Sequence, residues 1–315
     1  MLHLNLDLYS HLPAKQTSTM SFATFLGYFL GGYTALTIFF YLLSPMSSKS
    51  AFVARCLASY ISLVIAALYG ALISIALSCV GQRQIAQWTT GRVFKYAMAA
   101  TTGVTFEIID PKGHLEKVRP AVFVGNHQTE LDVLMLGCMF PKYCSVTAKS
   151  SLKRLPFLGW FMTLSGSVFI DRKSSKDARA AMSGAAEQMK TLGQSVYMFP
   201  EGTRSYAKEP MLLPFKKGAF HLAVQAQVPI VPAVAANYSD TLYIKGMVFK
   251  SGKIPCKVLD PIPTTGLTAA DVDDLCNKTR ELMLKEIINL TYQSWGQEAP
   301  IAASTVKASG VDLKQ

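Results

Sequence analysis

The chain has 315 residues, half of them hydrophobic, and carries 31 basic against 20 acidic side chains, a formal net charge of +11. This length suits one globular domain with extra segments, and the mean hydropathy of +0.26 is high for a soluble protein. The charge favours anionic lipid or phosphorylated substrates over nucleic acid, for which no basic and aromatic motif is present, and six scattered cysteines without a C-x-x-C pair indicate neither a disulfide framework nor a zinc site.

Two apolar runs occupy the N-terminal part of the chain, after a segment over 1–21. The run 22–43 has 22 residues without a charge, and the run 57–80 has 24. Each exceeds the roughly 20 residues that a helix needs to cross a bilayer core, and Ser44-Pro45-Met46-Ser47-Ser48 has the composition of a turn. The pattern predicts a membrane helical hairpin over 22–80, which either spans the bilayer or dips into one leaflet. A cleaved signal peptide is disfavoured because the first run is too long for one.

Basic residues near the hairpin ends predict its orientation. The loop between the runs holds Lys49 and Arg55, and the outer flanks hold Lys15, Arg83, Arg92 and Lys95. This bias places the large C-terminal domain on the cytosolic side. Glycans would instead mark a lumenal domain, and three Asn-X-Ser/Thr triplets offer that test, at Asn237, Asn277 and Asn289.

The body of the chain begins with 81–96, an amphipathic and basic stretch typical of a surface helix that links membrane to domain. Short apolar runs bounded by Gly, Pro or Asn then alternate with helical patterns. This alternation predicts an α/β domain over 81–296 with its sheet between helices, followed by an unpatterned polar tail over 297–315 that we expect to be disordered. We expect strands at 104–109, 121–124, 144–147, 167–170, 195–199 and 229–234, and helices at 131–139, 174–192, 217–227 and 269–292.

A histidine and an aspartate follow the apolar run 121–124. In an unbroken helix His127 and Asp132 would lie about 140° apart, so they meet only if His127 lies in a turn and Asp132 in the helix that follows. A carboxylate on one ring nitrogen would leave the other as a general base. Such a pair is common by chance. The chain lacks G-x-S-x-G, H-E-x-x-H, P-loop and G-x-G-x-x-G patterns, so this base would act on a nucleophile of the substrate.

A second polar block, 199–205, follows another predicted strand. Gly202 would let the backbone approach a ligand, Thr203 offers a hydroxyl and an amide, and Arg204 a planar fork suited to phosphate. The alternative is a β-turn with a surface ion pair. Between the two blocks, 149–173 holds five basic residues that would line a rim. Downstream, 228–234 is apolar but contains prolines that a central strand resists, so we expect an edge strand or a pocket wall.

Four blocks in this order resemble the motifs of the glycerolipid acyltransferases over about residues 95–265. The segment 126–132 resembles the first motif, 149–172 the second, 199–205 the third and 228–234 the fourth. The first and third are most similar to those of the 1-acyl-sn-glycerol-3-phosphate acyltransferases of eukaryotic membranes. The resemblance implies a mixed sheet flanked by helices.

The resemblance also implies a reaction between acyl-CoA as co-substrate and lysophosphatidic acid, without a metal or other cofactor, at the endoplasmic reticulum membrane or a lipid droplet. His127 would deprotonate the sn-2 hydroxyl as it attacks the thioester, without an acyl-enzyme, and Asp132 would orient the imidazole. The glycerol phosphate would be held by Glu201, Gly202, Thr203 and Arg204, with Arg172 from the second block.

Glu130 departs from the family pattern, which commonly has small or hydroxyl residues at this place, and we expect its carboxylate to face water. Two alternatives stay open. One is a related acyltransferase acting on another lysophospholipid or on glycerol 3-phosphate, and the other is a non-catalytic protein that shapes membranes. The sequence predicts no particular protein partner.

Overall fold

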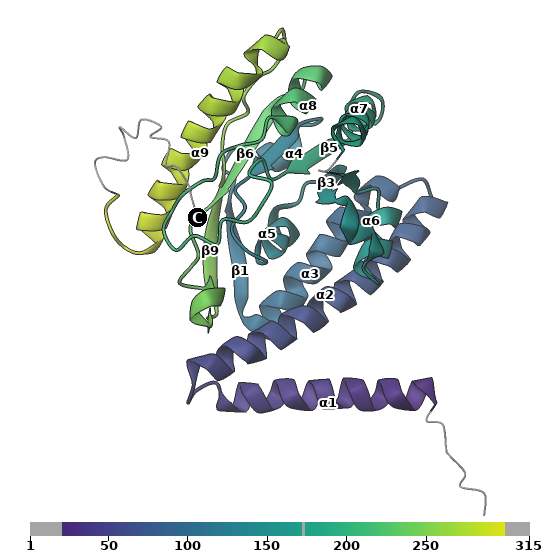
Figure 1. Ribbon diagram of the computed structural model, residues 1–315, viewed down its shortest axis with the longest axis vertical. Helices are drawn as coiled ribbons and strands as arrows, with labels where there is room; N and C mark the ends of the chain where they lie inside the picture. The colour runs from purple at the N-terminus through teal and green to yellow at the C-terminus, as the bar shows by residue number, and fades with distance from the viewer. Residues whose placement is uncertain (1–20, 172–173, 300–315) are drawn as a thin grey trace, which may run out of the picture.

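The structure, a computed structural model, describes residues 21–171 and 174–299. A seven-stranded mixed sheet lies between two layers of helices (Figure 1), which confirms the predicted α/β architecture. The strand order is β1-β9-β6-β2-β5-β3-β4. Its strands are β1 (Val104–Ile109), β2 (Val122–Gly125), β3 (Cys144–Lys149), β4 (Val168–Ile170), β5 (Ser195–Met198), β6 (Ile230–Ala235) and β9 (Gly252–Val258). A separate ribbon pairs β7 (Leu242–Tyr243) with β8 (Val248–Phe249).

The central strands are buried on both faces, so their sequences are almost continuously apolar. In β2, Val122 and Val124 join one hydrophobic cluster and Phe123 joins the other, because alternate side chains point to opposite faces. The first cluster is covered by α7 (Ser175–Leu192), α8 (Gly218–Ala226) and α9 (Val272–Ser294), and the second by α2 (Ser48–Cys79), α3 (Ala86–Thr102) and α5 (Asp132–Met139). Short elements complete the domain: η1 (Arg83–Ile85), α4 (His114–Lys117), η2 (Ser150–Arg154), α6 (Leu158–Leu164), η3 (Ile244–Gly246) and η4 (Ala269–Asp271).

The hairpin differs from the prediction in its second helix. The first helix, α1 (Phe22–Leu43), has the predicted bounds, whereas α2 begins at Ser48 instead of 57. Ser47 caps α2 by accepting a hydrogen bond from the Ser50 amide at 3.4 Å. Arg55, the charge that limited the predicted run, donates to the carbonyls of Thr102 at 3.1 Å and Phe249 at 3.2 Å. A charge satisfied by the domain therefore does not interrupt the helix.

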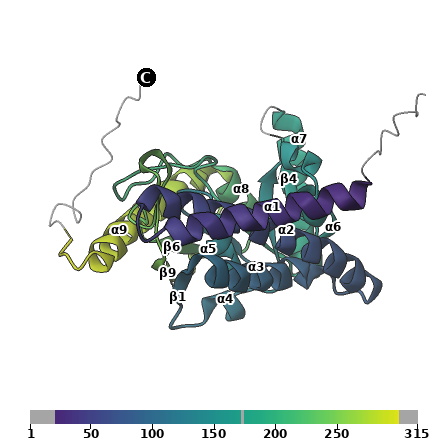
Figure 2. The same ribbon diagram turned by 90° about the horizontal axis from the view of Figure 1, so that it is seen from below.

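One face of α2 is a stripe of small buried side chains at a spacing of four residues, which lets neighbouring helices approach closely: Ala54, Ala58, Ser62, Ala66, Gly70 and Ser74. The predicted helix over 81–96 is present as η1 and the first part of α3, but α3 packs against α2 and α5 instead of lying on the surface. The opposite face of α2 exposes apolar side chains such as Leu72, and α1 has no buried residue. Figure 2 shows α1 lying across the underside of the domain. Both helices are long and apolar enough to cross a membrane, which indicates membrane association.

The strand β6 is central, so the predicted edge position is wrong. It lies between β2 and β9, and all six of its residues are buried. Pro232 is tolerated because no strand needs a hydrogen bond from its nitrogen. In a strand the carbonyl and the nitrogen of one residue face the same side, and the Pro232 carbonyl faces the Leu259 amide at 2.8 Å. This position lies one residue outside the pairing of β6 with β9, which begins at Ala233. The neighbouring strand β9 was not predicted, since lysines and a proline interrupt its apolar residues.

Three parallel neighbours, β6, β2 and β5, end at the same edge of the sheet. Ligands of open α/β sheets bind beyond the carboxyl ends of such strands. The loop after β2 carries the first block, and the loop after β5 carries the third block. The chain after β6 carries the residues that follow the fourth block. This edge of the sheet brings together polar residues that are far apart in the sequence.

Candidate active site

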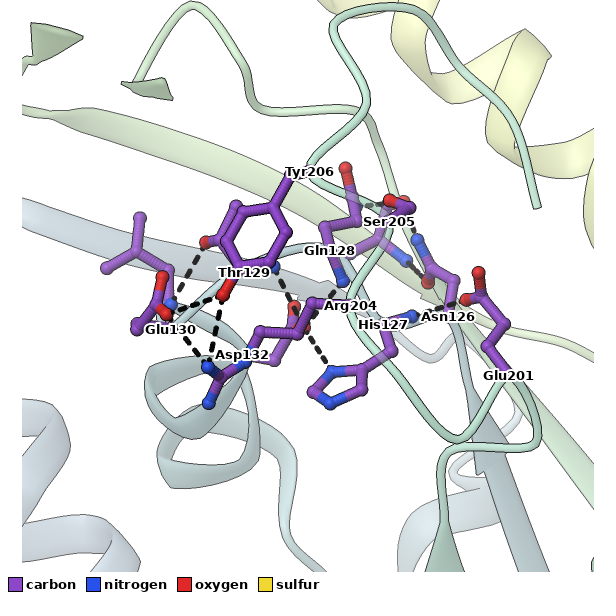
Figure 3. A network of polar contacts seen from close by, with 12 residues as sticks. Asn126, His127, Gln128, Thr129, Glu130, Asp132, Glu201, Arg204, Ser205 and Tyr206 are labelled. Carbon is purple, nitrogen blue, oxygen red and sulfur yellow. Dashed lines mark hydrogen bonds and ion pairs between the residues drawn. The ribbon is translucent and has the colours of Figure 1, made fainter. Parts of the chain in front are cut away.

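His127 and Asp132 meet at the carboxyl edge of the sheet. His127 lies in the loop after β2 and Asp132 is the first residue of α5, so the predicted strand, turn and helix are present. The Nδ1 atom of His127 lies 2.7 Å from Oδ2 of Asp132 (Figure 3). The Asp132 side chain is 1% exposed and that of His127 is 19% exposed. A buried carboxylate thus accepts from Nδ1–H and leaves Nε2 as the ring nitrogen able to take a proton.

Three further donors hold the Asp132 carboxylate. The backbone amides of Gln128 and Thr129 donate to Oδ2 at 2.6 and 3.2 Å, and the Tyr238 hydroxyl donates to Oδ1 at 2.6 Å. Burial, together with the nearby Asp132 charge, raises the pKa of Tyr238 well above its ordinary value, so the phenol stays protonated and remains a donor. The orientation of the carboxylate, and with it that of the imidazole, is fixed from several sides.

Tyr238 was missed by the sequence reasoning, which used Asn237-Tyr238-Ser239 only as a glycosylation triplet. The Asn237 side chain is buried, and its Nδ2 donates to the carbonyls of Ala207 at 3.0 Å and Glu209 at 3.2 Å. This triplet is therefore a structural part of the site. The signal that would have pointed to Tyr238 is its place just after β6, at the carboxyl edge where β2 also ends.

The side chains of the first block fasten its loop to the end of β6. Asn126 donates from Nδ2 to the Ala235 carbonyl and accepts at Oδ1 from the Ala235 amide, both at 2.9 Å. Gln128 donates from Nε2 to the Ala236 carbonyl at 2.8 Å. The His127 ring stacks on Phe199, with centroids 4.2 Å apart and planes at 16°. These contacts leave the imidazole little freedom to turn.

Glu201 supports the histidine loop from the third block. It is 3% exposed. Its Oε1 accepts from the His127 amide at 2.6 Å, and its Oε2 accepts from the Leu213 amide at 2.8 Å. Burial raises the pKa of Glu201 to about 7, although both amide bonds oppose the shift. Both carboxylate oxygens therefore support the loop backbone, and the contact of Glu201 with a phosphate stays a prediction.

The other candidates of the third block differ in exposure. Gly202, at φ +69°, makes the turn after Glu201 and is buried, whereas Thr203 is exposed. Arg204 is partly buried, and its Nη1 lies 2.8 Å from Oε1 of Glu130. Glu130 is thus paired instead of simply facing water, and the ion pair expected under the β-turn alternative is present. Arg172, the candidate from the second block, lies outside the described residues.

A cavity of about 280 Å³ opens beside the first and third blocks. Its wall is mostly apolar and includes Gln128, Thr129, Tyr206, Tyr238 and Leu242. Tyr238 and Tyr206 belong to the polar network: Tyr238 contacts Asp132 at 2.6 Å, and Tyr206 contacts Glu130 at 2.8 Å. The network therefore borders a space able to take part of a small ligand.

Comparisons with known proteins identify the family of this chain. The Acyltransferase family model matches residues 109–236. The chain is 41% identical over 224 residues to a 1-acyl-sn-glycerol-3-phosphate acyltransferase of Saccharomyces cerevisiae, covering 71% of this chain and 73% of that protein. It is 42% identical over 200 residues to the human 1-acyl-sn-glycerol-3-phosphate acyltransferase beta, covering 64% and 69%.

The fold is similar to the crystal structure of the 1-acyl-sn-glycerophosphate (LPA) acyltransferase, PlsC, from Thermotoga maritima. The TM-score is 0.57 at 20% identity, over 82% of this chain and 95% of that one, so this likeness concerns the fold alone. The sequence relatives carry the assignment further. The chain belongs to the glycerolipid acyltransferase family, close to the 1-acyl-sn-glycerol-3-phosphate acyltransferases.

Proposed function

We propose that this protein transfers an acyl group from acyl-CoA to the sn-2 hydroxyl of lysophosphatidic acid, giving phosphatidic acid and CoA. The names of its relatives support this acceptor. The observation that carries the mechanism is the 2.7 Å contact between Nδ1 of His127 and the buried Asp132 carboxylate. A histidine held in this way has one defined tautomer and one nitrogen available as a base.

In the proposed reaction, Nε2 of His127 takes the proton of the acceptor hydroxyl while that oxygen attacks the thioester carbonyl. The tetrahedral intermediate collapses as the carbon–sulfur bond breaks, and the imidazolium returns the proton to the CoA thiolate. Asp132 stabilises the transient imidazolium. The acyl group passes directly between the two substrates without an acyl-enzyme, and an activated thioester needs no metal or redox cofactor for this step.

The acceptor phosphate would bind to Gly202, Thr203 and Arg204. The guanidinium of Arg204 offers a planar fork for phosphate oxygens. Thr203, the preceding residue, is exposed and has a hydroxyl to donate. Glu201 fixes the His127 amide and thereby sets the distance between the base and this phosphate site. Arg172 stays a candidate for the same phosphate. Replacing Arg204 by Ala would raise the acceptor KM, at a cost of about 1.5–3 kcal/mol.

We also place the catalytic domain on the cytosolic face of the endoplasmic reticulum membrane, where both amphiphilic substrates partition. The apolar surfaces of α1 and α2 support attachment to a membrane, and the basic flanks of the hairpin support the cytosolic side. Glycosylation mapping tests it at Asn277 and Asn289, since Asn237 is buried. A glycan on either site would place the domain in the lumen.

The deciding experiment measures CoA release by the purified full-length protein with oleoyl-CoA and lysophosphatidic acid. We expect release by the wild type, none above background by His127→Ala, and normal release by His221→Ala, a matched change at an exposed histidine of α8. Equal release by His127→Ala would end the mechanism. A wild type active only on lysophosphatidylcholine would indicate a different acceptor, and one inert on every acceptor would favour a membrane-shaping role.

A further inference from the structure

The carboxylate of Glu130 lies between two hydrogen-bond donors of the third block's loop. Its Oε1 is 2.8 Å from Nη1 of Arg204 and 2.8 Å from the hydroxyl of Tyr206. The same hydroxyl lies 3.2 Å from Nη1. Figure 3 shows the three side chains converging close to Asp132. A single anionic oxygen therefore occupies the point at which a guanidinium and a phenol both donate.

This ion pair leaves part of the guanidinium unused. Nη1 alone makes the hydrogen bonds of Arg204 within 21–171 and 174–299, and neither Nη2 nor the buried Nε has a partner there. The Glu130 and Arg204 side chains are 46% and 36% exposed, and pairs with such exposure are worth only a factor of about 1.4–5 in an equilibrium constant. A ligand anion with more than one oxygen has donors to gain here and little to displace.

Tyr206 is held in place by the backbone. It adopts φ +48°, which is unfavourable for a residue with a side chain, and its amide donates to the Gln128 carbonyl at 3.1 Å. The preceding Ser205 amide donates to the His127 carbonyl at 2.9 Å. Burial raises the pKa of Tyr206, so its hydroxyl remains protonated. A strained tyrosine fixed to the histidine loop is a pre-organised donor.

We propose that Tyr206 is a further phosphate-binding residue, and that Glu130 is an internal anion which holds the place of a phosphate oxygen until the acceptor displaces it. The proposal rests on the proposed function. In the bound state a phosphate oxygen accepts from Nη1 of Arg204 and from the Tyr206 hydroxyl, and a second oxygen accepts from Nη2, which shares the end of the guanidinium with Nη1. The displaced Glu130 side chain turns into water.

The test compares the KM for lysophosphatidic acid in Glu130→Gln and Tyr206→Phe proteins. Glutamine keeps the shape and one acceptor oxygen but removes the competing charge, so we expect KM to fall about 2- to 5-fold. Phenylalanine removes a donor to a charged group, so we expect KM to rise by about 10-fold. Glu187→Gln and Tyr96→Phe, at exposed positions on α7 and α3, are the matched controls and leave this KM unchanged.

A KM that rises in Glu130→Gln as much as in Glu130→Ala would overturn the proposal, because Glu130 would then position Arg204 instead of competing for it. An unchanged KM in Tyr206→Phe would remove Tyr206 from the phosphate site. Thermal unfolding of each variant identifies a folding defect. The same substitutions in the His127→Ala protein, titrated with lysophosphatidic acid in the absence of acyl-CoA, give the comparison from binding alone. A wild type inert on lysophosphatidic acid overturns both proposals, whereas an active wild type with insensitive variants overturns only this one.

Discussion

Replacing Tyr238 by phenylalanine tests whether the buried carboxylate must be held from both sides. The change removes one oxygen and keeps the ring, which packs edge-on against Phe106 with centroids 5.8 Å apart. Among the described residues, Tyr238 is the one hydrogen-bond donor to Oδ1 of Asp132, at 2.6 Å. Thr129 also loses a partner, because its amide and hydroxyl lie 3.0 and 3.1 Å from the phenol oxygen.

The magnitude follows from the burial of Asp132, which is 1% exposed. A hydrogen bond to a charged group is worth about 1.5–3 kcal/mol, and an unpartnered buried carboxylate oxygen recovers none of it from water. We expect the free energy of unfolding to fall by about that amount. We also expect kcat to fall about 10-fold, a loss of about 1.4 kcal/mol in the transition state.

The assay measures kcat and KM for CoA release separately, because a loss of folded protein alone would not change kcat per folded molecule. With one donor fewer, the carboxylate that orients His127 is less firmly held, so kcat should fall while the KM of both substrates stays unchanged. Tyr197→Phe is the control: this tyrosine is equally buried, and its hydroxyl has no hydrogen-bond partner in the part of the chain that the structure describes. A folded Tyr238→Phe enzyme with the wild-type kcat would refute the reasoning.

Three other substitutions probe the scaffold. Gly125→Ala should lower the free energy of unfolding by about 1–3 kcal/mol in chemical unfolding, because a Cβ there would lie 2.9 Å from Cζ of the buried Tyr197. Gly184→Ala, in open space on α7, should be neutral or stabilising. Equal losses of stability in the two variants would contradict the argument. Glu201→Gln should remove a pH dependence of stability. The carboxyl ionises near pH 4.5 in the unfolded chain and near 7 in the folded protein, so the free energy of unfolding of the wild type falls by up to about 3 kcal/mol as the pH rises from 4.5 to 7. The same decline in the variant would exclude Glu201 as its source. Asn126→Asp should cost about 3 kcal/mol or more, since a carboxylate oxygen would face the Ala235 carbonyl in a fully buried site, whereas Asn277→Asp, at an exposed position of α9, serves as the control in the same thermal melts.

The sequence predicted the parts of the fold that depend on local patterns. Six of the seven strands of the main sheet lie within two residues of their predicted bounds, because each is a short apolar run between Gly, Pro or Asn. The meeting of His127 and Asp132 was also predictable, since a strand, a turn and a helix allow only a few arrangements of residues five apart. The bounds of α1 followed from its lack of charges.

The remaining features depend on contacts between distant segments. Pro232 is compatible with a central strand only because the β9 ladder ends beside it. Arg55 lies inside a helix because two carbonyls of the domain accept its hydrogen bonds. Glu130 pairs with a residue 74 positions away, and Tyr238 reaches Asp132 across 106 positions. No local pattern in the sequence encodes such partners.

The order of the strands explains why blocks so far apart make one site. β2 lies between β5 and β6, and all three run parallel, so the loops that follow them emerge side by side. The loop after β2 supplies His127, the proposed base, and the loop after β5 fixes the backbone of His127 through Glu201. The chain after β6 fixes the Asp132 carboxylate through Tyr238. The imidazole is therefore aligned by three separate strands, and a change at the end of any one of them should act on His127 without touching it.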